Sequence, residues 1–358
     1  RLHLEDKAQE EIDGIKIYRF TSPPKGSVFY FLYPVFSILF GAVTFRKILR
    51  DGNRIDILHY HTPFPAFGVE LATNTQVARR VFTFHSPRSK EYEIDTKGFL
   101  KISFLKRLFV WFVSRVERFV ISHSDIVVIL SDFMRHQIKE VHGCCQSISK
   151  IPSGVDVERF SPADKRSVRD ELGLSKEKKY LFTVRRLVAR MGLENLILAM
   201  KKVRDMGIEV ELLIGGDGYL RRNLEDLIKH NRLGRSVKLL GFVDDSLLPK
   251  YYQAADIFVL PTAALEGFGL IILESFATNT PVLATPVGAI PEIMEDFNEH
   301  LLFSSTKPDD MADLIRRALT NPDAINLYQD YRKVILEKYT WLNVNDQYLA
   351  LYRQAKSE

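Results

Sequence analysis

The stretch DIFVLPTAALEGFGLIILESFATNTPVLATPVGAIPE, Asp256 to Glu292, predicts a strand–loop–helix–strand unit. Residues 257–260 are apolar and stop at Pro261, which is typical of a buried strand. A short turn with two glycines follows at residues 266–269, and a second apolar run from Leu270 predicts a helix. Residues 281–284 predict the next strand. This alternation favours a parallel sheet with helices packed on it.

The turn between this strand and this helix is a candidate anion site. Backbone N–H groups at a helix N-terminus bind phosphate well, and Gly267 and Gly269 let the main chain approach a ligand closely. Two carboxylates, Glu266 and Glu274, lie eight residues apart across the unit. An elongated anionic ligand with hydroxyl groups at both ends suits this arrangement, and a nucleotide-sugar is one.

The composition is that of an ordinary globular protein of about two domains, with 358 residues, of which 46% are hydrophobic and 27% charged. A net charge of +5 permits nucleic acid or acidic membrane as a partner but demands neither, and we expect no nucleic acid. Cys144 and Cys145 are adjacent and lack metal-site spacing, which favours a reducing, cytoplasmic setting. Residues 26–45 carry no charge, and their polar residues and proline favour a buried or interfacial helix over a membrane span.

Strands and helices alternate along most of the chain, which predicts an α/β fold of two doubly wound, Rossmann-like domains that face each other across a cleft. The expected strands are residues 14–20, 55–60, 80–85, 125–130, 147–151, 180–184, 209–214, 237–240, 257–260, 281–284 and 300–303. The expected helices include residues 68–78, 132 onward, 193–204, 247–254, 308–319 and 341–354. We expect domains at residues 1–154 and 155–335, with a helix at residues 336–358 that returns to the first domain. A strand–glycine loop–helix unit is expected before the first domain.

Basic and acidic side chains fall where such domains bind ligands, at the carboxyl ends of strands. Glu274 lies among apolar residues, where a carboxylate needs a partner such as a ribose hydroxyl, although surface glutamates usually face water. Arg185 and Arg186 follow a predicted strand and Arg190 lies in the next loop, and arginine fits phosphate through its fork of donors. The alternative is a solvated basic loop. Gly216 belongs to a glycine turn that either contacts the nucleotide or only reverses the chain.

Three histidines end two neighbouring strands of the first domain. His85 is favoured as a functional residue that faces the cleft, where a neutral imidazole bonds sugar hydroxyls or carries a proton. His59 and His61 are favoured as structural residues. A third ligand at typical spacing is lacking, so no metal is expected.

Residues 97–120 predict an amphipathic helix with six basic residues and one acid, Glu117. Its apolar residues recur at helical spacing and are expected to face the core: Phe104, Leu108, Phe112, Val116 and Val120. The default interpretation is a core-facing helix with a solvated basic face. The alternative is docking on an anionic membrane surface, which would suit an acceptor held in lipid.

Taken together, these motifs resemble glycosyltransferase family four, the retaining, group 1 glycosyltransferases of the GT-B fold. The resemblance covers nearly the whole chain and depends on a set of short motifs: residues 56–61, Phe84-His85, residues 151–156, residues 160–162, Arg186-Leu187, residues 215–218, residues 241–243, Glu266 with Glu274, Pro281-Val282, Gly288 and Pro291-Glu292. In combination the motifs are specific, and each alone would be weak.

The resemblance implies a reaction and a set of roles. It implies that a sugar moves from an NDP-sugar to an acceptor hydroxyl with retained configuration, without a cofactor or catalytic metal, and that the acceptor is a lipid-linked or cell-surface glycan. Glu266 would contact the sugar, Glu274 the ribose, and His85 the reacting face of the sugar. Arg186 and the amides of Gly267, Phe268, Gly269 and Leu270 would hold the diphosphate.

The chain departs from the family where it has Arg185-Arg186-Leu187-Val188-Ala189-Arg190-Met191-Gly192. The family pattern is Gly-Arg-Leu-x-x-x-Lys-Gly, so the phosphate-binding lysine is replaced by Met191. Either Arg190 or Arg185 takes its place, or the diphosphate is held differently. The alternatives to a transferase are an NDP-sugar epimerase, a phosphorylase, for which no lysine-bound pyridoxal site is evident, and an NDP-sugar-binding GT-B protein without activity. The expected location is cytoplasmic, at the inner face of a membrane in the docking alternative.

Overall fold

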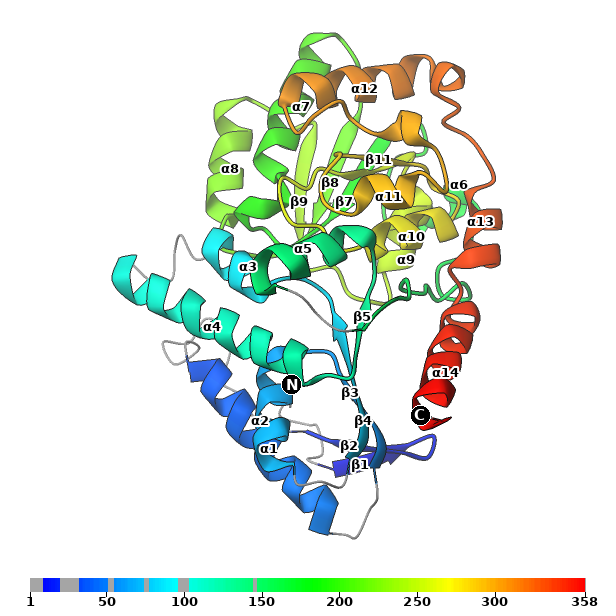
Figure 1. Ribbon diagram of the computed structural model, residues 1–358. Coiled ribbons are helices and arrows are strands. Elements are labelled where there is room, and N and C mark those ends of the chain that lie inside the picture. The colour runs from blue at the N-terminus through cyan, green and yellow to red at the C-terminus, as the bar shows by residue number, and fades with distance from the viewer. Residues whose placement is uncertain are drawn as a thin grey trace.

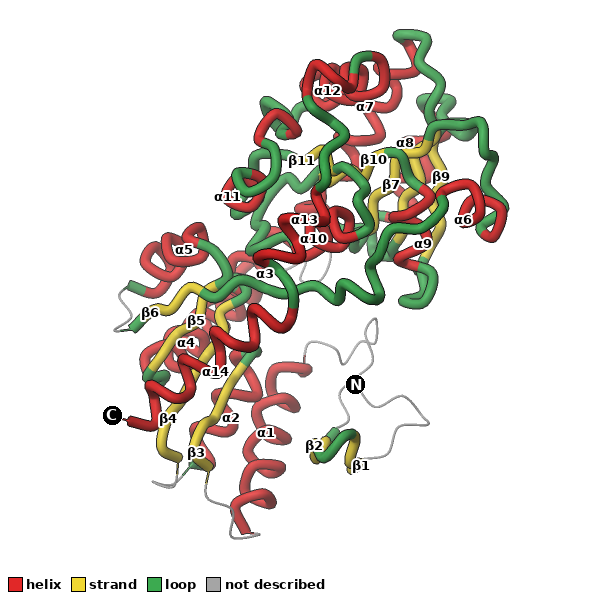
Figure 2. The backbone as a smooth tube through the Cα atoms, turned by 90° about the vertical axis from the view of Figure 1, so that its right-hand side faces the viewer, coloured by secondary structure: helices red, strands yellow, loops and turns green. Residues whose placement is uncertain are grey.

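The structure is a computed structural model that describes residues 9–19, 32–50, 55–73, 77–95, 103–143 and 147–357. Two parallel sheets lie in two lobes, and the C-terminal helix α14 runs beside the sheet formed by the first half of the chain (Figures 1 and 2). Cys144 and Cys145 lie outside the described residues, as do residues 20–31 and 96–102.

The first sheet is parallel throughout, with strand order β3-β4-β5-β6. Its strands are β3 (Ile55–Tyr60), β4 (Val77–Phe84), β5 (Ile126–Ile129) and β6 (Ile148–Lys150). Helices α2 (Pro63–Ala72), α4 (Ser103–His123) and α5 (Asp132–His142) contribute to the core on one face. Helix α14 (Trp341–Ser357) covers the other face, where Val344 and Leu351 pack against Val81 and Val128.

The N-terminal elements differ in part from the sequence-based prediction. The strand expected at residues 14–20 is β2 (Ile15–Tyr18), which pairs antiparallel with β1 (Gln9–Ile12) in a separate hairpin. The helix expected at residues 68–78 is α2, which begins five residues earlier because Pro63 occupies its first turn, where a fixed φ favours helix initiation. Helix α5 begins as predicted, with Ser131 as its N-cap accepting a hydrogen bond from the Met134 N–H.

The uncharged run at residues 26–45 is described only from residue 32, where it enters α1 (Tyr33–Arg50). One side of α1 packs on α2, where Phe45 lies against Ala72 and Gly41 approaches the Pro65 carbonyl. The other side exposes apolar residues, among them Leu39 and Val43. Within the described ranges, no helix combines the length and the apolar content needed to cross a membrane.

Helix α4 buries only part of the apolar residues expected to face the core. Val116 and Val120 are buried as predicted, but Phe104 is 71% exposed and Leu108 50% exposed, so the prediction for these two residues was wrong. The reason is that α2 and α5 cover only the C-terminal half of α4, so its first turns project beyond them. Helical spacing identifies an apolar side but not what covers it.

The one acid of α4, Glu117, is only 1% exposed and caps the start of helix α3 (Arg88–Asp95). Its carboxylate accepts hydrogen bonds from the backbone N–H groups of Arg88, at 2.6 Å, and Ser89, at 3.1 Å. Burial nevertheless raises the pKa of Glu117 to about 7. The folded chain therefore binds a proton between pH 4.5 and 7 that the unfolded chain does not, and this carboxyl makes the fold less stable as pH rises through that range.

We therefore expect Glu117→Gln to gain stability relative to the unchanged protein as pH rises from 4.5 to 7, by up to about 3 kcal/mol. Buried His142, whose Nε2 lies 3.7 Å from Glu117, titrates in both proteins. Its effect on stability is therefore smaller in the difference between the two proteins than in the pH dependence of either protein alone. Urea unfolding at pH 5 and pH 7 measures this difference. A difference that shrinks with rising pH would contradict the assignment.

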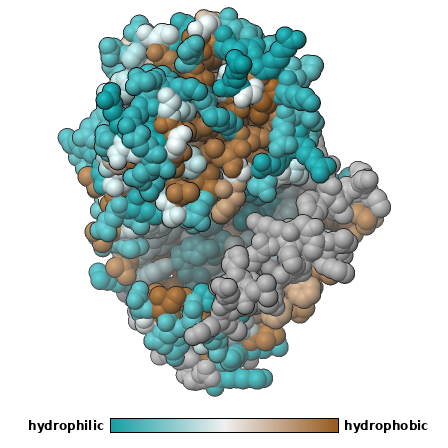
Figure 3. Space-filling view, turned by 180° about the vertical axis from the view of Figure 1, so that it is seen from behind, coloured by the Kyte–Doolittle hydropathy of each residue, from teal (hydrophilic) through white to brown (hydrophobic). Residues whose placement is uncertain are grey.

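The second sheet is also parallel, with order β11-β10-β7-β8-β9. Its strands are β7 (Tyr180–Val184), β8 (Glu211–Gly215), β9 (Val237–Gly241), β10 (Ile257–Leu260) and β11 (Val282–Ala284). The helices around it are α6 (Lys165–Glu171), α7 (Leu193–Asp205), α8 (Arg221–His230), α9 (Leu248–Ala254), α10 (Leu270–Ala277), α11 (Ile290–Met294), α12 (Pro308–Thr320) and α13 (Tyr331–Lys338). All four residues of β10 are buried, as expected for a strand covered on both faces. Seen from behind, the lobe of this sheet shows apolar residues gathered among hydrophilic ones (Figure 3).

The strand expected at residues 300–303 is not a full strand. Residues Glu299–Leu301 form a 3-10 helix, and only one bridge, between Ala284 and Leu302, joins the segment to the sheet. The Asn298 side chain accepts a hydrogen bond from the His300 N–H, and this local bond starts a turn in place of strand pairing.

Candidate active site

Three loops meet at the carboxyl end of the second sheet, and glycines let them pack without space for a side chain. A Cβ on Gly216 would lie 1.8 Å from the carbonyl oxygen of Arg185, and one on Gly192 would lie 1.9 Å from that of Pro261. Gly216 also has a φ of +124°, which disfavours any other residue. The glycine turn after β8 therefore fixes the main chain at Arg185, and direct contact of Gly216 with a nucleotide stays a prediction.

The N-terminus of α10 is open at this place. Gly269 is its N-cap with a φ of +86°, and no side chain in the described part of the chain caps the helix. The first backbone N–H groups of a helix have no partner within it, so they can donate to an anion here. The Phe268 side chain is buried in the core and anchors the turn, while Leu270 is 38% exposed.

Glu266 is held firmly beside this helix start. Its Oε2 accepts hydrogen bonds from Arg185 Nη2 at 2.6 Å and from the Thr262 hydroxyl at 3.1 Å. Its carbonyl oxygen accepts from the Ala289 N–H at 2.9 Å, and Gly288 leaves room for that close approach. The carboxylate is thus oriented by an ion pair, with its other oxygen available to a ligand.

The three arginines of the loop after β7 have different surroundings. Arg185 pairs with Glu266. Arg186 is exposed; burial raises the pKa of Glu91, but the charges of Arg88 and Arg190, and to a smaller extent that of Arg186, lower it below its usual value. Arg190 is buried, with Nη1 donating to the Leu265 carbonyl at 3.1 Å and Nη2 lying 3.3 Å from Glu91 of the first lobe. Arg190 therefore joins the two lobes, and a role of Arg186 or Arg190 in holding a donor stays a prediction.

Glu274 lies on α10, where its Oε2 accepts a hydrogen bond from the buried Tyr252 hydroxyl at 2.8 Å. Burial raises the pKa of Glu274, although the Tyr252 hydrogen bond and the charge of Arg159 lower it. A partly buried carboxylate with one hydrogen-bond partner among the described residues has unused acceptor capacity, which a pair of ligand hydroxyls can fill.

Glu274→Gln is expected to stabilise the fold while weakening nucleotide binding. Because the pKa of Glu274 is higher in the folded than in the unfolded chain, ionisation of Glu274 destabilises the fold above the folded-state pKa. Below the unfolded-state pKa the carboxyl is protonated in both states and has no such effect. The melting temperature of the variant should exceed that of the unchanged protein by more at pH 8 than at pH 5. The affinity for a nucleoside diphosphate should fall roughly tenfold with the loss of a charged acceptor. A destabilised variant with unchanged affinity would contradict both parts.

The histidines of the first lobe lie at the carboxyl ends of β3 and β4. His61 Nδ1 lies 3.2 Å from His85 Nε2, so one ring donates to the other. Desolvation, then His61 and Arg88, lower the pKa of His85, which keeps its imidazole neutral at pH 7. His59 contacts the Thr83 hydroxyl at 2.7 Å and the Tyr352 hydroxyl of α14, as a structural residue would. Among the described residues, no three His, Cys, Asp or Glu side chains are grouped to hold a metal ion.

The two lobes touch at the site itself. A Cβ on Gly267 would lie 2.3 Å from the carbonyl oxygen of His85, and the Ser131 hydroxyl donates to the Gly267 carbonyl at 2.8 Å. Glu292 of α11 accepts a hydrogen bond from the Asp132 N–H at 2.8 Å, at the start of α5. These contacts bring His85 opposite the Glu266 turn, as the paired-domain prediction requires.

Sequence reasoning missed several of these residues. Ser131, Glu292 and Lys150, whose Nζ lies 2.7 Å from Glu292, hold the lobes together, and Glu91 is the partner of Arg190. Ser131 carried a signal as the N-cap of α5 and Glu292 as part of a motif, but neither signal predicted a contact between the lobes. Ser131 and Lys150 contact residues 136 and 142 positions away, and Glu91 contacts Arg190 99 positions away, a range that no local pattern covers.

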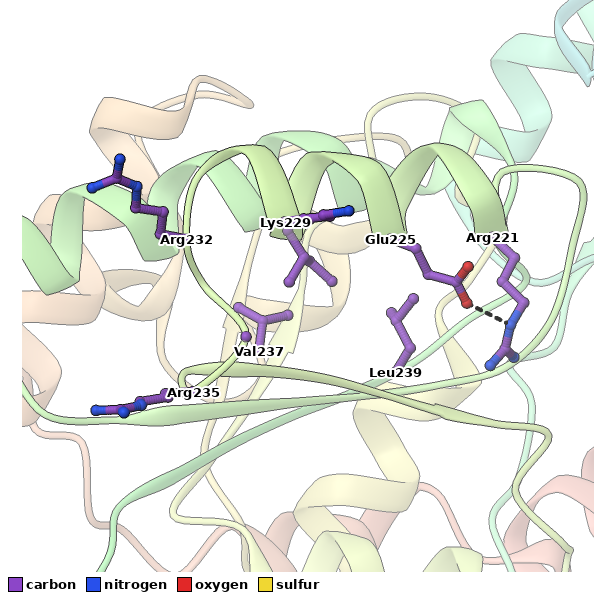
Figure 4. A pocket seen from close by; sticks show the side chains of 9 residues that line it. Arg221, Glu225, Lys229, Arg232, Arg235, Val237 and Leu239 are labelled. Atoms are coloured by element: carbon purple, nitrogen blue, oxygen red, sulfur yellow. Dashed lines mark hydrogen bonds and ion pairs between the residues drawn. The ribbon is translucent and has the colours of Figure 1, made fainter.

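A groove on the second lobe lies away from this site. It runs under α8 along the edge strand β9, and its labelled rim is mainly basic (Figure 4). Arg221 and Glu225 on this rim pair with each other at 3.0 Å (Figure 4). The groove includes no residue of the turns after β7 and β10, where Glu266 pairs with Arg185 beside the start of α10, so it is separate from the candidate active site.

Two facing parallel sheets, with a glycine-lined site at the carboxyl ends of the second, define the class: this is a GT-B fold. The model of glycosyl transferases group 1 matches residues 164–335, and that of glycosyltransferase family 4 matches residues 4–159. The chain belongs to this family of glycosyltransferases.

Relatives and solved structures agree with this assignment. An uncharacterized glycosyltransferase of Methanocaldococcus jannaschii is 32% identical over 64% of this chain and 60% of its own. The phosphatidyl-myo-inositol mannosyltransferase of Mycobacterium tuberculosis is 28% identical over 87% of this chain and 78% of its own. A GDP-mannose-dependent phosphatidylinositol monomannoside mannosyltransferase of Corynebacterium glutamicum is 30% identical, over 55% of this chain and 54% of its own. The chain thus spans little more than half of the Methanocaldococcus and Corynebacterium proteins.

The fold itself is shared with distant structures. The sucrose-phosphate synthase of Thermosynechococcus elongatus superposes with a TM-score of 0.80 at 23% identity, over 98% of this chain and 86% of that one. The Anabaena protein HepE, solved with UDP and glucose, superposes with a TM-score of 0.69 at 18% identity, over 92% and 83% of the chains.

Proposed function

We propose that this protein is a hexosyltransferase that moves a sugar from an NDP-sugar to an acceptor hydroxyl with retention of anomeric configuration. The observation that carries the proposal is the position of Glu266. Its oriented carboxylate lies beside the N-terminus of α10, and the next residue, Gly267, lies against the backbone of the neutral His85 on the facing lobe. A diphosphate at the helix start would bring the attached sugar to the carboxylate.

Each group then has a chemical task in the proposed reaction. The bond from the anomeric carbon to the diphosphate oxygen breaks, and the acceptor oxygen bonds to the same face of that carbon. The acceptor proton passes to the departing diphosphate. The α10 N–H groups and Arg186 stabilise the charge that develops on that diphosphate, a preorganised electrostatic effect. Glu274 binds the ribose, and neutral His85 bonds a sugar hydroxyl. The reaction as proposed uses neither a cofactor nor a catalytic metal.

Donor and acceptor are proposed from the names of relatives. Two relatives are mannosyltransferases of phosphatidylinositol lipids, and the Corynebacterium protein is named as dependent on GDP-mannose. We therefore propose a lipid-linked glycan acceptor with a hexose donor such as GDP-mannose. This acceptor class agrees with the basic, partly apolar surface of the first lobe described below.

Thermal unfolding with UDP-, GDP- and ADP-sugars tests the donor half of this proposal. A donor present at 100 times its Kd should stabilise the fold by about 2.7 kcal/mol. The base that gives the largest increase in melting temperature identifies the donor class. An unchanged melting temperature with every nucleotide-sugar would contradict the proposal.

We also propose that helix α4 docks the first lobe on an anionic membrane. Its first turns expose large apolar side chains (Phe104, Leu105, Leu108 and Trp111). Exposed basic residues accompany them on the same helix, including Arg107 and Arg115, whose guanidinium lies 5.9 Å over the Trp111 ring. Apolar residues beside arginines are suited to the headgroup region of an anionic bilayer.

Trp111→Ala is expected to reduce sedimentation with vesicles that contain phosphatidylglycerol, and the loss should exceed that of Tyr328→Ala. Tyr328 is similarly exposed, at 62% against 59%, but lies on the other lobe. Binding of the unchanged protein should weaken as salt increases, since the basic residues act through screened charge. Equal binding of both variants would contradict docking through α4.

A further inference from the structure

Arg185 and Met191 are in direct contact in the floor of the candidate site. Arg185 Nε lies 3.1 Å from the Met191 Sδ, and Nη2 lies 2.8 Å from it. The Arg185 side chain is only 8% exposed, and Met191 is 6% exposed. The charged guanidinium of Arg185 therefore lies against the end of the Met191 side chain.

The guanidinium is oriented but not saturated. Nη2 donates to Glu266 at 2.6 Å and to the Thr262 hydroxyl at 3.0 Å. Nη1 donates to none of the described residues, so the N–H groups on that edge have no protein acceptor in this part of the chain. An arginine has five donors in a fixed fork that matches two oxygens of a phosphate or carboxylate. A largely buried guanidinium with an unused edge is suited to an anionic ligand.

The Arg185–Glu266 ion pair lies close to the other anion-binding groups. A Cβ on Gly269, the N-cap of α10, would lie 3.7 Å from Glu266 Cγ. The ion pair of Arg185 with Glu266 is therefore adjacent to the first N–H groups of α10. A phosphate at that helix start lies within reach of a guanidinium that Glu266 holds in place.

The same two residues are the departures from the family pattern. The pattern has glycine where this chain has Arg185 and lysine where it has Met191. A lysine at position 191 beside Arg185 would place two cations in contact in a poorly hydrated site, which is unfavourable. An uncharged, polarizable thioether removes that repulsion and fills the space.

We propose that Arg185 binds the diphosphate of the nucleotide-sugar and that the uncharged Met191 side chain packs against it. The cation of the site is then at residue 185 in this chain, whereas the family pattern has it at residue 191. This inference rests on the proposed function, because it assumes a nucleoside diphosphate at the α10 N-terminus. In this arrangement Glu266 holds the guanidinium through Nη2, and the Nη1 edge faces the phosphate.

Calorimetric titration of the whole chain with GDP and UDP, and with GMP and UMP, tests the assignment in four proteins: unchanged, Arg185→Gly, Met191→Lys and the double variant. Arg185→Gly should weaken diphosphate binding roughly ten- to hundredfold, since a charged hydrogen bond is lost. Monophosphate binding should change by less than threefold. The double variant, which restores the family pattern, should regain at least tenfold over Arg185→Gly, whereas Met191→Lys alone should bind more weakly than the unchanged protein.

The assignment would be overturned if Arg185→Gly bound nucleoside diphosphate as tightly as the unchanged protein. It would also be overturned if the double variant bound no more tightly than Arg185→Gly. If Arg185→Gly does not fold, Arg185→Gln keeps the polar contact to Glu266 without the charge, and the same loss is expected; unchanged affinity would overturn the assignment. A different result, in which the unchanged protein binds no nucleoside diphosphate, would contradict the proposed function itself.

Discussion

Glu266→Gln is expected to lower the turnover number for sugar transfer by roughly 10²–10³-fold, the usual cost of removing one preorganised group from an active site. Glutamine has nearly the same shape but no charge, so it cannot stabilise positive charge that develops at the anomeric carbon. It also leaves Arg185 without its ionic partner at 2.6 Å. The KM for the donor should change less than the turnover number, because the diphosphate contacts remain.

The matched control for this variant is Glu225→Gln. Glu225 also pairs with an arginine, Arg221 at 3.0 Å, but it lies on the exposed surface of α8 away from the site. Surface pairs of this kind contribute little, so transfer and stability should be nearly unchanged. Steady-state release of NDP from both variants measures the difference. Equal turnover in Glu266→Gln and Glu225→Gln would remove Glu266 from the chemistry.

Gly267→Ala is expected to reduce transfer roughly 100-fold without unfolding either lobe. The new Cβ would lie 2.3 Å from the His85 carbonyl oxygen, whereas ordinary contact begins at 3.4 Å, so the lobes must separate by about 1 Å there. Gly267 has a φ that other residues adopt, so the substitution adds no backbone strain of its own. The effect should therefore come from the distance between His85 and the Glu266 turn.

Gly234→Ala is the control for this substitution. Gly234 also lacks a positive φ, and a Cβ there would meet nothing within 4 Å. Gly234→Ala should keep full activity, whereas Gly267→Ala should lose activity and keep the affinity of the second lobe for nucleoside diphosphate. If Gly267→Ala retained full turnover, the close contact of the lobes would have no part in the reaction.

The elements that sequence alone predicted well are those whose information is local. The apolar run of β10 and the start of α5 at Asp132 each depend on a few neighbouring residues. Strand β7 begins and ends where the pattern placed it. Two doubly wound sheets then follow from the order of the elements.

What sequence could not provide depends on contacts between distant segments. The pairing of Arg185 with Glu266 joins residues 81 apart, and that of Asp132 with Glu292 joins residues 160 apart. Arg190 looked equivalent to Arg185 as a basic loop residue, yet only the structure distinguishes their partners, Glu91 and Glu266. Phe104 and Leu108 have the spacing of core residues but are exposed, because spacing does not reveal where neighbouring helices end.

The most direct measurement of the central claim is the product of transfer from a labelled NDP-hexose. The protein is incubated with GDP-mannose, UDP-glucose or ADP-glucose and phosphatidylinositol vesicles, and both NDP release and the anomeric proton signal of the glycolipid are followed by NMR. We expect equal amounts of NDP and glycolipid from one donor, with the α configuration of that donor retained. A folded protein that releases no NDP from any donor, or that forms a β-linked product, would contradict it.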